Sequence, residues 1–414
     1  MVSKMIKFYI MALLTFVDLT QTNCQENSVL DELFLPIVRD FQISMGKVFR
    51  DFEPSNRRLL KRMGKAVPAL SPTKQFPCDL KNYKPRSDSV PDNVHKLRPG
   101  DIDVIGAMGD SLTAGTGISA TSVPEEIFVA QRGRSWAGGG EKNWRHFLTL
   151  PNILKEFNPN LIGFATRAAH STEWESQFNV AESGAISSQM PYMAKELVKR
   201  IKMDPRVDLN RHWKMITFMI GDNDFCSEVC ISNSYYKAIQ KHKEDLYKVL
   251  RYLKDNLPRT IVNVVPPPRL DVLYKMKNLP LSCYLTQNVA CPCIRNVIYA
   301  DKKRIMKDLM IKWQKSVMEI GTMPDWGSNN FAVIVQPFTL NLTFPKTSTG
   351  DLDYSFLGPD CFHFSEKGQA RFANGLWNSM MEPFGHKNTD GSDNASKFHC
   401  PSEKHPYIYT LENS

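Results

Sequence analysis

The chain has 414 residues, enough for one large domain with extensions or for two modest domains. Apolar residues make up 42% and charged residues 23%, which is ordinary globular usage and excludes collagen-like, coiled-coil and largely disordered chains. The net charge of +9 comes from 52 Lys and Arg against 43 Asp and Glu. This mild excess is compatible with an anionic lipid surface, although a solvated basic surface is its commoner explanation.

The N-terminus has the pattern of a secretory signal. Lys4 and Lys7 precede an apolar run of ten residues, Phe8 to Val17, and small polar residues follow at Thr20 to Thr22. The run is shorter than the ~20 residues that span a bilayer, and the three parts in this order are typical of a signal peptide. We expect residues 1–22 to be removed and the mature protein to be secreted and extracellular. An uncleaved anchor or a buried first helix are the alternatives.

Two further patterns agree with secretion. The segment from Gly385 to Ser414 is polar and has no apolar tail, which argues against a membrane or lipid anchor there. Asn341 and Asn394 each begin an Asn-x-Ser/Thr glycosylation acceptor, so we expect a glycoprotein.

Nine cysteines occur, and one of them lies in the expected cleavage zone. The other eight can form four disulfides in an oxidising compartment. We expect Cys226 to pair with Cys230 or with a cysteine of the 283–293 region, and we expect Cys361 to be bonded. Cys291-Pro292-Cys293 suits metal or redox chemistry in a cytosolic protein, but structural disulfides fit a secreted chain better.

Residues 23–97 are predicted to be an N-terminal extension and linker. Val29 to Phe52 has helical apolar spacing, and Ser71 to Pro99 is rich in Pro, Ser and charge. The basic run between them can contact anionic headgroups or be a processing site, although a solvated helix face is the commoner outcome. This run consists of Arg57, Arg58, Lys61, Arg62 and Lys65.

Short apolar segments, typical of buried strands, alternate with amphipathic helices in residues 98–385. This alternation predicts an α/β fold with a parallel sheet covered on both faces. The region 270–300 is interpreted as an insertion pinned by disulfides. The expected strands are 102–108, 161–165, 215–220, 261–265 and 331–336. The expected helices are 144–157, 189–203, 235–256, 299–320 and 366–381.

A serine follows the first expected strand directly, in Gly109-Asp110-Ser111-Leu112. The carboxyl ends of parallel strands are where ligands bind in open sheets, so Ser111 is a candidate nucleophile. A plain helix N-cap is the alternative. Gly115 to Ala120 matches a loose dinucleotide fingerprint, but it begins too far after the strand. Its glycines are better explained as turn residues.

Two more motifs follow later strands. Asn223, in Gly221-Asp222-Asn223-Asp224, has a side-chain amide that can donate to an oxyanion, or it can simply form a turn. Asp360 precedes His363 by three residues, so one loop can hold a carboxylate that orients a general base. Three motifs lie at the carboxyl ends of three strands, and together they supply Ser, Asp and His in this chain order. This combination predicts a serine hydrolase. Such chemistry needs no metal and no cofactor.

With these motifs the sequence resembles the GDSL, or SGNH, serine esterases, in particular their phospholipase B branch of the animal membrane-associated type. The resemblance covers Arg98 to Gly385 and extends to longer strings of residues. It implies a three-layer flavodoxin-like fold with a five-stranded parallel sheet in the order 2-1-3-4-5. Residues 386–414 then form a polar tail. The longer strings are Arg132 to Trp136, Thr149 to Pro159 and Leu376 to Met380.

The resemblance also implies roles for single residues. Ser111 is the nucleophile, His363 the base and Asp360 the acid that orients it. The oxyanion hole consists of the backbone N–H of Ser111, the amide of Asn223 and Gly184, for which a turn glycine is the alternative. Relatives mostly carry a small residue where Asp222 stands. We expect this side chain to point away from the site or to hold a loop through hydrogen bonds.

The implied function is hydrolysis of acyl esters of glycerophospholipids and lysophospholipids by a secreted enzyme. A transient contact with a membrane surface fits this function, no nucleic-acid partner is expected, and the oligomeric state is left open. Two alternatives remain at this point. One is a secreted esterase of another lipid or of short-acyl esters, and the other is a catalytically silent lipid-binding protein.

Overall fold

The computed structural model describes residues 29–51, 53–232, 234–277, 279–391 and 397–414, and the chain divides into two units, residues 1–47 and 48–414. In the first unit the described residues belong to helix α2, Val29–Arg50, which the apolar spacing predicted. The expected signal peptide and the glycosylation acceptor at Asn394 lie outside the described residues.

The second unit alternates strands with helices, as the sequence predicts. Its strands are β1 (Ile102–Gly109), β2 (Trp213–Met219), β3 (Thr260–Val265) and β4 (Phe331–Val335). Its helices up to β3 are α3 (Glu53–Arg62), α4 (Ser111–Ala114), α5 (Val123–Phe128), α6 (Leu150–Phe157), α7 (Met190–Met203) and α8 (Tyr235–Asn256). The later helices are α9 (Leu281–Ala290), α10 (Pro292–Arg295), α11 (Lys303–Gly321) and α12 (Glu366–Met380).

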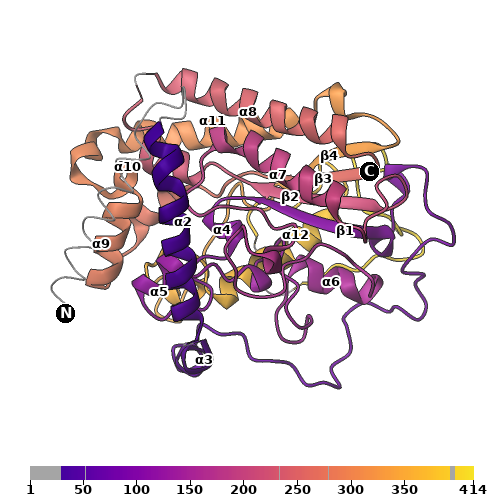
Figure 1. Ribbon diagram of the computed structural model, residues 1–414, viewed down its shortest axis with the longest axis horizontal. Helices are drawn as coiled ribbons and strands as arrows, with labels where there is room; N and C mark the ends of the chain where they lie inside the picture. The colour runs from indigo at the N-terminus through magenta and orange to yellow at the C-terminus, as the bar shows by residue number, and fades with distance from the viewer. Residues whose placement is uncertain (1–28, 52, 233, 278, 392–396) are drawn as a thin grey trace. The chain divides into compact units, whose positions relative to one another are not determined.

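The four strands form one parallel sheet in the order β1-β2-β3-β4. Every strand residue is buried, because helices cover both faces of the sheet. Figure 1 shows α7, α8 and α11 on one face, with α6 and α12 on the other. The predicted α/β class with a parallel sheet is therefore confirmed.

One of the five expected strands, residues 161–165, does not form, so the sheet has four strands within the described residues. Ile162 still exchanges backbone hydrogen bonds with β1, at 2.8 Å to the Asp103 carbonyl and 2.9 Å from the Ile105 N–H. Gly163 then turns away at φ +98°, and a Cβ there would lie 2.4 Å from the Ile105 oxygen. Phe178 takes over, since its carbonyl accepts from Ala107. The edge of β1 is thus shared by two short segments instead of one strand.

The helix expected at 144–157 begins later than predicted, at Leu150. The Thr149 hydroxyl accepts from the Asn152 N–H at 3.2 Å, and Pro151 lies in the first turn. A threonine N-cap followed by proline is a strong start signal, and here it outweighs the apolar spacing upstream.

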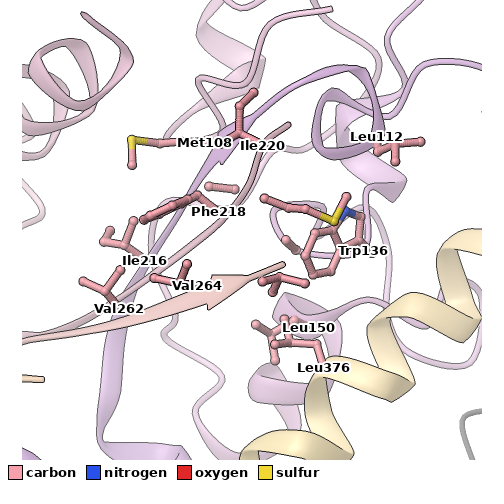
Figure 2. Close-up of a cluster of buried hydrophobic side chains, with 14 of the residues drawn as sticks. Met108, Leu112, Trp136, Leu150, Ile216, Phe218, Ile220, Val262, Val264 and Leu376 are labelled. Carbon is pink, nitrogen blue, oxygen red and sulfur yellow. The ribbon is translucent and has the colours of Figure 1, made fainter. Parts of the chain in front are cut away.

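The core lies between the sheet and its helices, and Figure 2 shows part of it. Ile216, Phe218 and Val264 come from neighbouring strands. Trp136 packs against Phe372 of α12, with ring centroids 5.7 Å apart. Phe218 and Trp136 are at most 1% exposed. Full burial of one such side chain stabilises the fold by roughly 1.5–3 kcal/mol. The buried core between the sheet and its helices therefore holds in place the strand ends at which the motifs lie.

Eight cysteines form four disulfides, as expected for an oxidising compartment. Cys226 pairs with the insertion, which resolves the alternative left open by the sequence, and Cys361 is bonded. The 270–300 insertion is tied down at three points. The pairs are Cys78–Cys400, Cys226–Cys291, Cys230–Cys293 and Cys283–Cys361.

The basic run of the extension has two parts. Arg58, Lys61 and Arg62 are exposed, as a solvated face predicts. Arg57 instead forms an ion pair with Glu366 of α12, and Lys65 donates to the Gly358 carbonyl at 3.0 Å. Among the described residues, no helix combines the length and the apolar character needed to cross a bilayer.

Candidate active site

Ser111 lies on a tight turn between β1 and α4. Gly109 has φ +139°, and a Cβ at this position would lie 2.4 Å from the Met219 carbonyl oxygen of the neighbouring strand. Asp110 then caps α4, because its carboxylate accepts from the Leu112 N–H at 3.0 Å. Ser111 is the first residue of this short helix and is 5% exposed. The turn therefore fixes the hydroxyl at the carboxyl edge of the sheet.

The loop before α12 holds Asp360 and His363. The Gly358 N–H donates to the His363 carbonyl at 2.7 Å, which closes the loop on itself. One carboxylate oxygen of Asp360 accepts from the backbone N–H groups of Phe362 at 2.9 Å and His363 at 3.0 Å. Cys361 has φ +56°, a left-handed conformation that costs a non-glycine residue about 1–2 kcal/mol. Such strain persists only where the surroundings impose it.

The three predicted residues come together in one hydrogen-bonded chain. The Ser111 hydroxyl lies 2.7 Å from His363 Nε2, and His363 Nδ1 lies 2.7 Å from Asp360 Oδ2. We assign the ring proton to Nδ1, because the neighbouring carboxylate can only accept, so Nε2 accepts from the serine. Burial raises the pKa of Asp360, but the His363 charge and the hydrogen bonds outweigh it and leave the pKa below its ordinary value.

Helix α9 holds the Asp360–His363 loop from outside. Cys283 of α9 is bonded to Cys361, and the buried Gln287 amide donates to the Cys361 carbonyl at 2.9 Å and the Asp360 carbonyl at 3.5 Å. These contacts impose the left-handed conformation of Cys361. The predicted insertion thus supports the loop that carries two of the three site residues.

We expect the double variant Cys283→Ala/Cys361→Ala to lose at least about 10-fold in kcat, because the loop loses its covalent tether. Activity should fall at a lower temperature than the global unfolding seen by near-UV circular dichroism. The matched control is Cys78→Ala/Cys400→Ala, which removes a disulfide with an even longer sequence separation, 322 residues against 78. Equal losses of activity in both variants would show that the effect is one of general stability.

The predicted oxyanion donors lie around a second loop. The Asn223 amide donates to the Ala185 carbonyl at 2.9 Å, which leaves its second N–H for another acceptor. Gly184 is exposed and has φ +81°. It lies between Glu182, whose N–H donates to the Gly109 carbonyl at 2.9 Å, and Ala185, whose carbonyl accepts from Asn223. This loop and the Ser111 turn therefore meet at the end of β1.

Three buried aspartates lie behind the site. Burial raises the pKa of Asp110 and of Asp224, each to about 7. The pKa of Asp222 lies well above its ordinary value, because of burial and of the charges of the other two. Of the two roles that we expected for Asp222, hydrogen bonding to a loop is wrong, because neither carboxylate oxygen has a hydrogen-bond partner within the described residues. That the side chain points away from the site stays a prediction. A raised pKa favours the neutral form of this side chain, and the neutral form adds little negative charge beside an oxyanion.

We expect Asp222 to lower the free energy of unfolding as the pH rises above about 4, because its raised pKa means that it binds its proton more tightly in the folded state. In Asp222→Asn this contribution disappears, so the variant should be more stable than the parent by at least about 1 kcal/mol at pH 8, with a smaller gain at pH 5. Urea unfolding at both pH values measures it. The exposed Asp351→Asn is the control, and parallel curves for parent and Asp222→Asn would contradict the assignment.

Sequence reasoning missed Glu126 of α5. Its side chain is 4% exposed, and its Oε1 lies 3.5 Å from His363 Nδ1. Gly117 and Gly358 leave the room for it, because a Cβ at these positions would lie 2.3 Å and 2.7 Å from its Oε1. Burial and the charge of Asp360 raise the pKa of Glu126 well above its ordinary value. No motif indicated it, because its place beside His363 depends on how α5 packs.

Glu126, Asp360 and His363 also form a group whose ligand atoms lie within 4.8 Å of one another, so they could in principle hold a metal ion. However, His363 Nδ1 donates to Asp360, and Asp360 already accepts two backbone N–H groups. The raised pKa of Glu126 also disfavours metal binding, because a carboxylate must lose its proton to act as a ligand. The arrangement suits proton transfer better than metal binding.

Outside the site, Asn341 is exposed, as a glycosylation acceptor requires.

A parallel α/β sheet with Ser111, His363 and Asp360 in one hydrogen-bonded chain at its carboxyl edge is the architecture of a serine hydrolase. Residues 105–376 match the GDSL-like lipase/acylhydrolase family. The chain belongs to this family, and the resemblance inferred from its motifs is confirmed.

Curated relatives narrow the comparison. The chain is 38% identical over 333 residues to membrane-associated phospholipase B1 of Homo sapiens, which covers 79% of the chain. It is 36% identical over 334 residues to the Mus musculus protein of the same name, which covers 80%. The chain spans 22% of the length of each relative. A crystal structure of phospholipase A1 from Streptomyces albidoflavus covers 67% of this chain and 99% of its own, at 16% identity and a TM-score of 0.30, too low to add to the assignment.

Proposed function

We propose that this chain is a serine hydrolase that cleaves acyl esters of glycerophospholipids and lysophospholipids through an acyl-serine intermediate. The observation that carries the proposal is the pair of 2.7 Å contacts from Ser111 through His363 to Asp360. The phospholipid substrate class is supported by the relatives, which are called phospholipase B1.

In the first step Ser111 Oγ attacks the acyl carbonyl carbon while His363 Nε2 takes the hydroxyl proton. The carbonyl π pair moves onto oxygen, and Asp360 stabilises the imidazolium that forms. Collapse of the tetrahedral intermediate breaks the bond to the alcohol, which leaves with the proton from His363. Water then attacks the acyl-serine with the same residues in the same roles, and this attack releases the fatty acid and restores Ser111.

The oxyanion of each intermediate is held by the backbone N–H groups of Ser111 and Gly184 and by the amide of Asn223. One such donor is typically worth about 3–4 kcal/mol in the transition state. We therefore expect Asn223→Ala to lower kcat by roughly 10²–10³-fold with little change in KM. Steady-state kinetics on a soluble ester measures both, with the exposed Asn210→Ala as control. A change in KM alone would make Asn223 a substrate-binding residue instead.

We further propose that the protein is secreted, with residues 1–22 as signal peptide, 23–97 as extension, 98–385 as hydrolase domain and 386–414 as tail. Four disulfides support an oxidising compartment. Cys400 of the tail is bonded to Cys78 of the extension, which ties the two flanking segments together.

The experiment that tests the function uses the purified full chain. Labelling of Ser111 by a fluorophosphonate probe supports an enzyme, and no labelling favours a silent lipid-binding protein. Hydrolysis is then compared on phosphatidylcholine, lysophosphatidylcholine and a short-acyl ester. Turnover of the short ester alone would favour the alternative esterase and overturn the phospholipid assignment.

A further inference from the structure

Helix α9 carries its apolar side chains on its outer face. Four of them have the spacing i, i+3, i+4 and i+8, which places them on one side of a helix. The opposite side holds Cys283 and Gln287, which are buried at 2% and 0% exposure. A helix on the surface of a soluble protein normally has the reverse arrangement. The exposed side chains are Leu281 at 72%, Tyr284 at 47%, Leu285 at 55% and Val289 at 52%.

This outer stripe lies directly over the candidate active site loop. Cys283 and Gln287 attach the inner side of α9 to Cys361 and to the Asp360 carbonyl. A helix with its side chains is about 10 Å across, so whatever contacts the stripe lies roughly one helix diameter from that loop. Figure 1 shows α9 at the margin of the second unit, outside the helices that enclose the sheet.

The charges of the segment that contains the stripe indicate what contacts it. From Val272 to Ala300 the sequence contains Lys275, Lys277 and Arg295 and no Asp or Glu. Lys275 and Lys277 are exposed, and Asp271, 3.7 Å from Lys275, precedes the segment. A second copy of the chain, docked through the same face, would bring like charges together. Anionic headgroups above acyl chains complement both the lysines and the apolar stripe.

We propose that the outer face of α9 inserts into the surface of an anionic phospholipid layer and holds the Asp360–His363 loop at that surface. The proposal deepens the proposed function, on which it rests for its substrate. It makes the disulfide-tied insertion the part of the protein that brings the site to lipid, and it assigns attachment to the apolar stripe and preference for anionic lipid to the lysines.

The test measures binding of the full chain carrying Ser111→Ala, so that the lipid is not consumed. Vesicles of phosphatidylcholine alone and of phosphatidylcholine mixed with phosphatidylserine are sedimented with the protein. We expect tighter binding to the mixed vesicles. Adding Leu281→Ser/Leu285→Ser should lower the partition coefficient by at least about 10-fold, because two leucines no longer insert.

The matched control is Met203→Ser/Leu411→Ser, with side chains of similar exposure, 71% and 50%. Met203 is the last residue of α7, the helix that precedes β2. Leu411 lies two residues before Asn413, whose amide donates to the carbonyl of His95, a residue that precedes β1. Both side chains therefore lie toward the amino ends of the strands. Binding of this variant should stay within about twofold of the parent, as for surface changes away from a binding site.

Three outcomes would overturn the proposal: a parent that binds neither kind of vesicle, equal binding of the leucine variant and the parent, or equal losses in the leucine variant and the control. A dimer in light scattering that only the leucine variant abolishes, without vesicle binding, would assign the stripe to a second copy.

With Ser111 intact, the leucine variant should hydrolyse a soluble short-acyl ester at the parent rate. If the parent hydrolyses no ester but binds vesicles through α9, the proposed function fails and the lipid surface remains.

Discussion

Ser111→Ala is expected to abolish ester hydrolysis, with a loss of roughly 10⁴-fold or more, while the protein remains folded and keeps its disulfides. The reason is that Ser111 Oγ makes the 2.7 Å contact with His363 Nε2, on a turn that Gly109 and Asp110 fix. Removing one oxygen atom at the first position of α4 leaves this turn intact. The measurement is the rate on a soluble short-acyl ester, together with the near-UV circular dichroism spectrum.

The matched control for this variant is Ser282→Ala, which removes an exposed hydroxyl on α9. It should react with a fluorophosphonate probe as fast as the parent, whereas Ser111→Ala should not react. Turnover by purified Ser111→Ala comparable to the parent would remove Ser111 from the mechanism, and with it the proposed acyl-serine intermediate.

Asp360→Asn is expected to lower kcat by about 10⁴-fold with little loss of stability. An asparagine can still accept from the Phe362 and His363 N–H groups, so the loop keeps its form. Its amide cannot stabilise the imidazolium as a carboxylate does, and it allows the ring to hold the wrong tautomer. The exposed Asp351→Asn is the control and should keep the parent rate.

The acid side of the pH profile separates Asp360 from other groups. Its pKa lies below the ordinary value near ~3.9, so its carboxylate form stabilises the fold above that pH, and this contribution is lost only as the pH falls through the lowered pKa. Any loss of activity well above pH ~4 therefore has another origin.

If Asp360→Asn kept the parent rate, Glu126 would be the next candidate, 3.5 Å from His363 Nδ1. The double variant Asp360→Asn/Glu126→Gln would then lose the activity.

Asp224, a carboxylate of the motif that contains Asn223, is bound elsewhere. Both of its oxygens accept from the Ser187 N–H, at 3.1 Å and 3.2 Å. From sequence alone it is the carboxylate to consider next after Asp360, because it also follows the end of a strand. The difference comes from the direction in which the turn after β2 runs, and that direction depends on packing.

Much of the fold and of the site follows from local sequence. The strands containing Met215, Ile261 and Phe331 are short, apolar and β-branched or aromatic, and parallel sheets buried on both faces require this composition. Ser111 and Asp360 were found because ligands bind at the carboxyl ends of such strands, so motifs that follow strands are expected to meet.

Other features were not accessible from local sequence. Residues 161–165 have the composition of a strand, but a strand also needs an unbroken hydrogen-bonded edge, and Gly163 ends it after Ile162. The partner of Cys226 depended on where α10 packs, since a cysteine pairs with whichever thiol the fold brings near. The outward stripe on α9 was hidden in a disulfide-rich segment whose burial could not be judged from spacing.

The sequence by itself determined the family, the α/β class, the eight bonded cysteines and the residues Ser111, Asn223, Asp360 and His363 as candidates. These depend on residue types and on short spacings, which a chain carries whatever its neighbours are. Only the tertiary structure decided the disulfide pairs, the four-stranded sheet and the position of Glu126 beside His363. It also decided the shared burial of Asp110, Asp222 and Asp224. The reason is that these features join parts of the chain that only packing brings together, and the pKa of a carboxyl group reflects the solvent and the charges around it.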